Sequence, residues 1–138
     1  NCTFTNNTSE AHGGAVCCSG STNYFTDCVF TGNTSTGKST NGGAIFLQNA
    51  GASAEIINCT FTENTATNYG GAVEQNNNVT DGALKIVNTT FMNNAAKGGG
   101  ALLTWMGDVT VENCSFEHNE ATGTSGGAWY ASLKDAVT

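Results

Sequence analysis

The chain has 138 residues, of which eleven are acidic and four are lysine or arginine, so its net charge is −7. An acidic chain without arginine is poorly suited to binding phosphate backbones or anionic lipid, which excludes nucleic acid as a partner. Only 11% of the residues are charged, and Asn, Thr, Ser and Gly supply most of the polarity. No apolar run reaches the roughly eighteen residues of a membrane helix, so we expect no membrane insertion by this segment. This composition favours an extracellular or cell-surface protein.

A pair of short motifs recurs five times along the chain. Each copy has a phenylalanine with an asparagine three residues later, followed by Gly-Gly-Ala and a large apolar residue. The phenylalanines are Phe4, Phe30, Phe61, Phe91 and Phe116, the asparagines are Asn7, Asn33, Asn64, Asn94 and Asn119, and the glycine motifs begin at Gly13, Gly42, Gly70, Gly99 and Gly126. The phenylalanines are 26, 31, 30 and 25 residues apart. A motif kept at a varying spacing is typical of a solenoid with turns of variable length.

A short strand is predicted before each phenylalanine. Segments such as Lys85 to Phe91 and Val109 to Phe116 alternate with period two, which points side chains two positions apart to the same side. The inward side then carries the phenylalanines, predicted to stack as the core, and a column of mostly small thiols two positions earlier. That column is Cys2, Cys28, Cys59, Thr89 and Cys114. The outward side carries hydroxyl-rich positions such as Thr3 and Thr60.

Turn residues follow each strand. The asparagine turns the chain, and stacked copies of it can form an amide ladder. The two glycines allow a tight bend, and the alanine fits a cramped inward corner. We expect a flattened or triangular coil of about two or three strands, each pairing in parallel with its copy about 4.8 Å above. Residues 1–138 are therefore predicted to form one all-β solenoid segment of about five rungs.

The alternation of five Gly-Gly-Ala-[Ile/Val/Leu/Trp] motifs with five Phe-x-x-Asn motifs closely resembles the repeats of the chlamydial polymorphic outer-membrane-protein family. The resemblance covers nearly the whole chain, and the paired motif is specific because both halves keep their order. It implies a right-handed parallel β-helix, the fold of the family's passenger domains. It also implies a role as a surface adhesin.

Cysteine is the first candidate for chemistry. Cys2, Cys28 and Cys59 are predicted on adjacent rungs, where Cα atoms about 4.8 Å apart lie within the range of a disulfide. A bridge between Cys2 and Cys28 can therefore form in an oxidising compartment. The alternative is a ladder of small buried thiols, which we favour for Cys59 and Cys114. No Cys-x-x-Cys pair or histidine cluster indicates zinc.

The remaining polar residues predict no catalytic, cofactor-binding or metal site. His12 and His118 lie near turns and are expected to be solvated. The aspartates are scattered over different turns, and no arginine is available as a base or substrate clamp. Two minor alternatives stay open: a polysaccharide-acting β-helix enzyme, for which Glu117 and Glu120 are the nearest acidic pair, and an ice-binding face built from Thr-x-Thr strands.

Eight Asn-x-Ser/Thr sequons make N-glycosylation a candidate modification, relevant only in a glycosylating secretory pathway. The candidate sites are Asn78, Asn58, Asn88, Asn113 and Asn33. Three of them, Asn58, Asn88 and Asn113, share one outward column, where glycans about 4.8 Å apart would be crowded. An unmodified asparagine ladder is the alternative for that column. Asn78 lies in the longest turn and is the best single candidate.

The leading functional hypothesis is a non-enzymatic structural or adhesive segment of an extracellular fibre or surface stalk. Exposed strand edges recruit further strands unless they are blocked. Ala136 to Thr138, joined to Asn1 to Phe4, would repeat the pattern of Thr110 to Phe116, so we expect copies to stack end to end. The start without methionine favours a piece of a longer protein. The alternative is an adhesin passenger that binds glycans or another cell-surface ligand.

Overall fold

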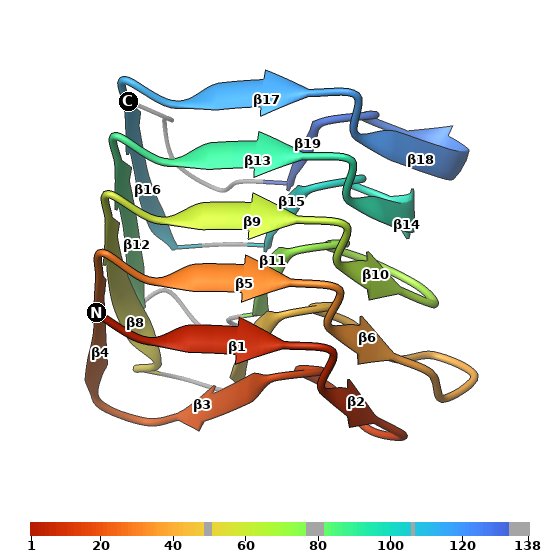
Figure 1. Ribbon diagram of the computed structural model, residues 1–138, viewed down its shortest axis with the longest axis horizontal. Coiled ribbons are helices and arrows are strands. Elements are labelled where there is room, and N and C mark those ends of the chain that lie inside the picture. Colours follow the sequence, from red (N-terminus) through yellow and green to blue (C-terminus); the bar gives the residue numbers. More distant parts are fainter. Residues whose placement is uncertain (49–50, 77–81, 106, 133–138) are drawn as a thin grey trace.

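The computed structural model describes residues 1–48, 51–76, 82–105 and 107–132, and in these ranges the chain is all-β. The chain winds as a right-handed parallel β-helix (Figure 1). Each complete coil has four strands separated by corners, and the chain then continues into the next coil. The described strands give four complete coils and most of a fifth. The predicted solenoid is therefore confirmed.

Four parallel sheets run along the helix axis, and we name them A to D in chain order. Sheet A holds the phenylalanine strands β1 (Thr3–Thr5), β5 (Val29–Thr31), β9 (Thr60–Thr62), β13 (Thr90–Met92) and β17 (Ser115–Glu117). Sheet B holds β2 (Thr8–Ser9), β6 (Thr34–Ser35), β10 (Thr65–Ala66), β14 (Ala95–Gly98) and β18 (Glu120–Ser125). Sheet C, after the glycines, holds β3 (Val16–Ser19), β7 (Ile45–Gln48), β11 (Val73–Asn76), β15 (Leu102–Trp105) and β19 (Trp129–Ser132). Sheet D holds β4 (Thr22–Thr26), β8 (Ser53–Ile57), β12 (Ala83–Val87) and β16 (Asp108–Glu112).

The corner between sheets D and A corrects the predicted number of strands. Asn58, Asn88 and Asn113 have φ angles of 54°, 50° and 51°, and Asp27 at the equivalent place has 53°. Asparagine and aspartate tolerate this left-handed conformation better than other residues with a side chain. The predicted single strands over Lys85 to Phe91 and Val109 to Phe116 are wrong, because each is divided at this corner. A coil therefore has four strands instead of two or three.

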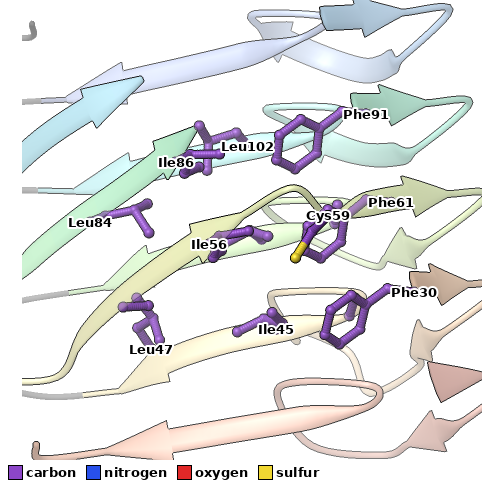
Figure 2. Close-up of a cluster of buried hydrophobic side chains, with 14 of the residues drawn as sticks. Phe30, Ile45, Leu47, Ile56, Cys59, Phe61, Leu84, Ile86, Phe91 and Leu102 are labelled. Carbon is purple, nitrogen blue, oxygen red and sulfur yellow. The ribbon is translucent and has the colours of Figure 1, made fainter. Parts of the chain in front are cut away.

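The phenylalanines of sheet A form one continuous stack along the interior. Successive ring centroids are 4.6, 4.7, 4.9 and 4.8 Å apart from Phe4 to Phe116, and the rings are within 7° of parallel. Figure 2 shows the central rings of Phe30, Phe61 and Phe91 with aliphatic side chains from sheets C and D packed beside them. All three central rings are fully buried. The strand register pairs each phenylalanine with its copy in the next coil.

Glycine is needed at each of the two positions before sheet C for a different reason, as Gly70 and Gly71 show. Gly70 has φ of 61°, a left-handed conformation that glycine adopts without strain. A Cβ atom at Gly71 would lie 2.0 Å from the carbonyl oxygen of Gly100 in the next coil. The first glycine therefore makes the bend and the second allows adjacent coils to approach.

The asparagines after sheet A form a buried ladder of amides. Asn64 Oδ1 accepts hydrogen bonds from the backbone nitrogen and Nδ2 of Asn33, both at 3.0 Å. Asn64 Nδ2 in turn donates to Asn94 Oδ1 and to the carbonyl of Phe30, also at 3.0 Å. The same bonds continue to Asn7 at one end and to Asn119 at the other. Every hydrogen-bonding position of the Asn64 side chain is thus used inside the protein.

We predict that Phe61→Ala lowers the free energy of unfolding by about 3–5 kcal/mol, because it removes a buried ring and opens a cavity in the stack. Thr62→Ala is the matched control, since Thr62 follows on the same strand and is only half-buried. Urea denaturation followed by circular dichroism measures both. An unchanged denaturation midpoint for Phe61→Ala would contradict the role of the stack.

Candidate functional site

The predicted glycosylation sites fall in different environments. Asn58, Asn88 and Asn113 are exposed at the corner between sheets D and A. There Asn88 Nδ2 donates to Asn58 Oδ1, and Asn58 Nδ2 donates to Asp27 Oδ1, each at 3.2 Å. This outer ladder is the unmodified arrangement considered above, and glycosylation of these residues stays a prediction.

The other two candidate glycosylation sites are Asn33 and Asn78. Asn33 has no exposed surface, and its Nδ2 is bonded to Phe4 O and Asn64 Oδ1 inside the helix. The candidate site at Asn33 is therefore wrong for this fold, because a glycan on that nitrogen would break its hydrogen bonds and has no space inside the helix. Asn78 lies outside the described residues, as does the tail, Ala136 to Thr138, used above to predict end-to-end continuity.

The cysteine column lies directly after the corner between sheets D and A, and its side chains form hydrogen bonds with the backbone there. The Sγ of Cys28, Cys59 and Cys114 lies 3.2 to 3.3 Å from the carbonyl oxygen two residues earlier, at Thr26, Ile57 and Glu112. Thr89 makes the equivalent bond to Val87 O at 3.0 Å through its hydroxyl. The column therefore selects a small side chain that can donate a hydrogen bond, which explains why threonine replaces cysteine in one coil.

All six cysteines lie within the described residues and are free thiols. The Cys28 thiol is directed to the carbonyl of Thr26, and a bridge from Cys2 to Cys28 in an oxidising compartment stays a prediction. Burial raises the pKa of the Cys59 and Cys114 thiols. Burial beside Cys17 raises the pKa of Cys18 to about 11. These thiols are therefore protonated at neutral pH and poor nucleophiles.

A row of contacts between coils covers the outer face of sheet C. In two places the residue before a glycine pair contacts the residue four positions after the first glycine of the next pair. His12 stacks on Phe46 with ring centroids 4.3 Å apart and accepts a hydrogen bond from the Asn41 backbone at 3.1 Å. The expectation that His12 is solvated is therefore wrong, whereas His118 is exposed. In the next coil, Asn41 Nδ2 donates to Glu74 Oε1 at 3.0 Å.

Glu74 is a carboxyl group buried in this row, with 2% of its surface exposed. Burial raises its pKa to about 9, against the opposing effect of the Asn41 hydrogen bond. The carboxyl is therefore protonated and uncharged at neutral pH. Glu74 Oε2 and Asn41 Oδ1 are both buried without a hydrogen-bond partner among the described residues. A protonated Oε2 supplies a donor where the ionised form would present only acceptors.

A pocket of about 240 Å³ opens beside this pair on the outer face of sheet C. It is lined by Asn41, Asn68, Tyr69, Glu74, Asn76, Leu103 and Trp105. The strand register places Glu74 next to Leu103 and Asn76 next to Trp105. The walls therefore come from β11, β15 and the turns before β7 and β11. A wider depression of about 350 Å³ lies on sheet D, with Tyr24, Glu55, Lys85 and Asp108 among its lining residues.

Sequence reasoning missed Glu74 and the pocket. The available signal was the column four residues after the first glycine of each pair, which otherwise contains Cys17, Phe46, Leu103 and Tyr130. A glutamate in such a column indicates a buried carboxyl. In the described part of the chain, no group of three or more His, Cys, Asp or Glu side chains could hold a metal ion, and no helix is long and apolar enough to cross a membrane.

We predict that Cys59→Thr retains stability, because threonine supplies the donor that Thr89 supplies in the next coil. Cys59→Val has nearly the same shape as the threonine variant but removes the side-chain donor to the Ile57 carbonyl, which then keeps only its bond from the Asp27 backbone nitrogen. It should therefore be less stable than Cys59→Thr by about 1 kcal/mol, the net contribution of one hydrogen bond, in urea denaturation. Equal stability of the two variants would contradict a hydrogen-bonding role for the column.

We predict that rising pH destabilises the protein through Glu74. Its folded pKa of about 9 lies above the ordinary value of 4.5, so the folded state holds a proton that the unfolded state loses between those values. Stability therefore falls with pH across this window, by up to several kcal/mol. Glu74→Gln keeps the neutral shape, and its advantage over the wild type should grow from pH 5 to pH 8 in thermal denaturation. A pH-independent difference would show that Glu74 is ionised in the folded protein.

Comparison with known proteins adds to this geometry. The sequence model of the Chlamydia polymorphic membrane protein repeat matches residues 1–19, 27–48, 58–74 and 88–104. The last three matches begin at the left-handed corner residues Asp27, Asn58 and Asn88, so the family's repeat corresponds to the coil. No solved structure gives a significant match.

Two curated relatives are much longer than this chain. The chain is 37% identical over 102 residues to the probable autotransporter YfaL of Escherichia coli (strain K12), covering 70% of this chain and 8% of that protein. It is 31% identical over 158 aligned positions to the probable outer membrane protein pmp6 of Chlamydia pneumoniae, covering 93% of this chain and 12% of that protein. It thus spans about a tenth of the length of these relatives. Because the repeat model matches more than half of the residues, the chain belongs to the Chlamydia polymorphic membrane protein repeat family.

Proposed function

We propose that this chain is a rigid, non-enzymatic segment of a surface-exposed passenger, which extends as a stalk and presents its outer faces to other surfaces. Two relatives are named as an autotransporter and an outer membrane protein, which supports a location at the cell surface. The stalk role rests mainly on the continuous core. The phenylalanine stack, the asparagine ladder and the four sheets all extend from each coil to the next.

The polarity of the amide ladder supports extension by further coils. Each inner asparagine donates toward the next coil and accepts from the previous one. Among the described residues, Asn7 Oδ1 accepts no hydrogen bond, and the backbone nitrogen of Asn119 donates none. The two outer coils therefore present complementary groups, and a further coil on either side can continue the ladder.

We assign the continuing coils to the same longer chain, since the relatives are about ten times longer. Head-to-tail association of separate copies would use the same edges and stays a prediction. Sedimentation of the purified segment as a monomer at all concentrations would contradict it. Adhesion to a glycan or other cell-surface ligand belongs to the same proposal, because the outer faces are polar and carry few charges.

The surface location is tested by labelling cells that produce the whole protein with antibodies raised against this segment. We expect labelling of intact cells and its loss after external protease treatment. A periplasmic or cytoplasmic protein, labelled only after permeabilisation, is the control. Labelling of this segment that also requires permeabilisation would contradict the proposal.

A further inference from the structure

We propose that the pocket on the outer face of sheet C is a binding site for one neutral sugar ring. This inference rests on the adhesive part of the proposed function and gives it a site and a class of ligand, whereas the stalk role is tested separately by the surface labelling above. Two aromatic side chains, two free amides and the uncharged Asn41–Glu74 pair line a single small hollow. Such a lining matches a ligand that has apolar C–H faces and a rim of hydroxyl groups.

The aromatic part of the pocket comes from Tyr69 and Trp105. Trp105 ends β15, and 38% of its surface remains exposed although it is a large apolar side chain. Tyr69 lies in the turn before β11 and is half-buried. Aromatic rings combine a broad apolar face with a polar edge and lose little conformational entropy on binding. The C–H face of a pyranose can pack on such a ring while its hydroxyls remain free to bond.

The polar part of the pocket has unused hydrogen-bonding capacity. The side-chain amides of Asn68 and Asn76 form no hydrogen bond within the described part of the chain, although both line the pocket. Asn41 Oδ1 and Glu74 Oε2, from two further lining residues, also lack partners there but are buried. An amide offers two donors and one acceptor oxygen, which matches hydroxyl groups that both donate and accept.

Charge and size narrow the class of ligand. Among the lining residues that the structure describes, Glu74 is the only acidic or basic side chain, and it is protonated at neutral pH for the reason given above. The pocket thus holds no fixed charge for a cation or a phosphate, which favours a neutral sugar. Its volume of about 240 Å³ is below the roughly 300 Å³ at which pockets for larger ligands begin, so it fits one ring.

The test is a titration of the ¹⁵N-labelled chain with methyl glycosides of glucose, galactose, mannose and N-acetylglucosamine, observed by NMR. We expect at least one of them to shift the indole N–H signal of Trp105 saturably, with a dissociation constant of about 1 mM, typical of a single-ring site. A disaccharide with the same terminal sugar should bind within a few-fold of the methyl glycoside.

Matched variants complete the experiment. Trp105→Ala should weaken binding by at least tenfold, measured on the amide signals of β11, and Asn76→Ala should weaken it by a smaller factor. Tyr24→Ala is the control, because Tyr24 is a more exposed aromatic on sheet D and its loss should leave affinity unchanged. Three results would overturn the proposal: no saturable shift with any glycoside, equal binding by Trp105→Ala, or tighter binding of phosphate or methylammonium than of every sugar.

Discussion

The buried amide ladder is the constraint on which the rest of the β-helix depends. An asparagine with no exposed surface is costly unless each of its polar atoms is paired. Asn64 meets this requirement only when the coils before and after it lie in register, because its partners are Asn33, Asn94 and Phe30. The ladder therefore fixes the register of each coil with its neighbours along the helix axis. The same register places the phenylalanine rings of successive coils on top of one another.

With the interior fixed in this way, the outer faces are free to differ between coils. Three kinds of residue recur in the coils because the backbone needs them at the turns. Corner asparagines adopt a left-handed conformation, glycine pairs allow a bend and close approach, and small residues such as Cys59 bond to a backbone carbonyl. The pairs across the outer face of sheet C do not recur: one is an aromatic stack of His12 and Phe46, and the next is an amide bonded to a carboxyl. A stalk of constant core can thus carry local sites on its surface, and the pocket beside Glu74 is one such place.

The sequence predicted the parts of the structure that repeat. Phe61 and Asn64 were placed correctly because five copies of one motif reveal which columns must be stacked. The left-handed corner at Asn58 was missed, because the alternation that links Cys59 to Phe61 was extended back through Asn58. The inward positions change phase there, since Ile56 and Cys59 both face the core although they are three residues apart. The partnership of Asn41 with Glu74 was also missed, since it joins two columns on different turns of neighbouring coils, whose separation along the chain varies with turn length.

The most direct test of this account is the unfolding free energy of Asn64→Ala compared with Asn7→Ala. Both residues occupy the ladder, but Asn64 has no exposed surface and four side-chain hydrogen bonds, whereas Asn7 is exposed and its side chain forms one. Unpaired buried groups cost about 1–3 kcal/mol each. Asn64→Ala should therefore lose about 4 kcal/mol or more, and Asn7→Ala about 1 kcal/mol or less. Equal losses for the two variants would show that the ladder does not hold the coils in register.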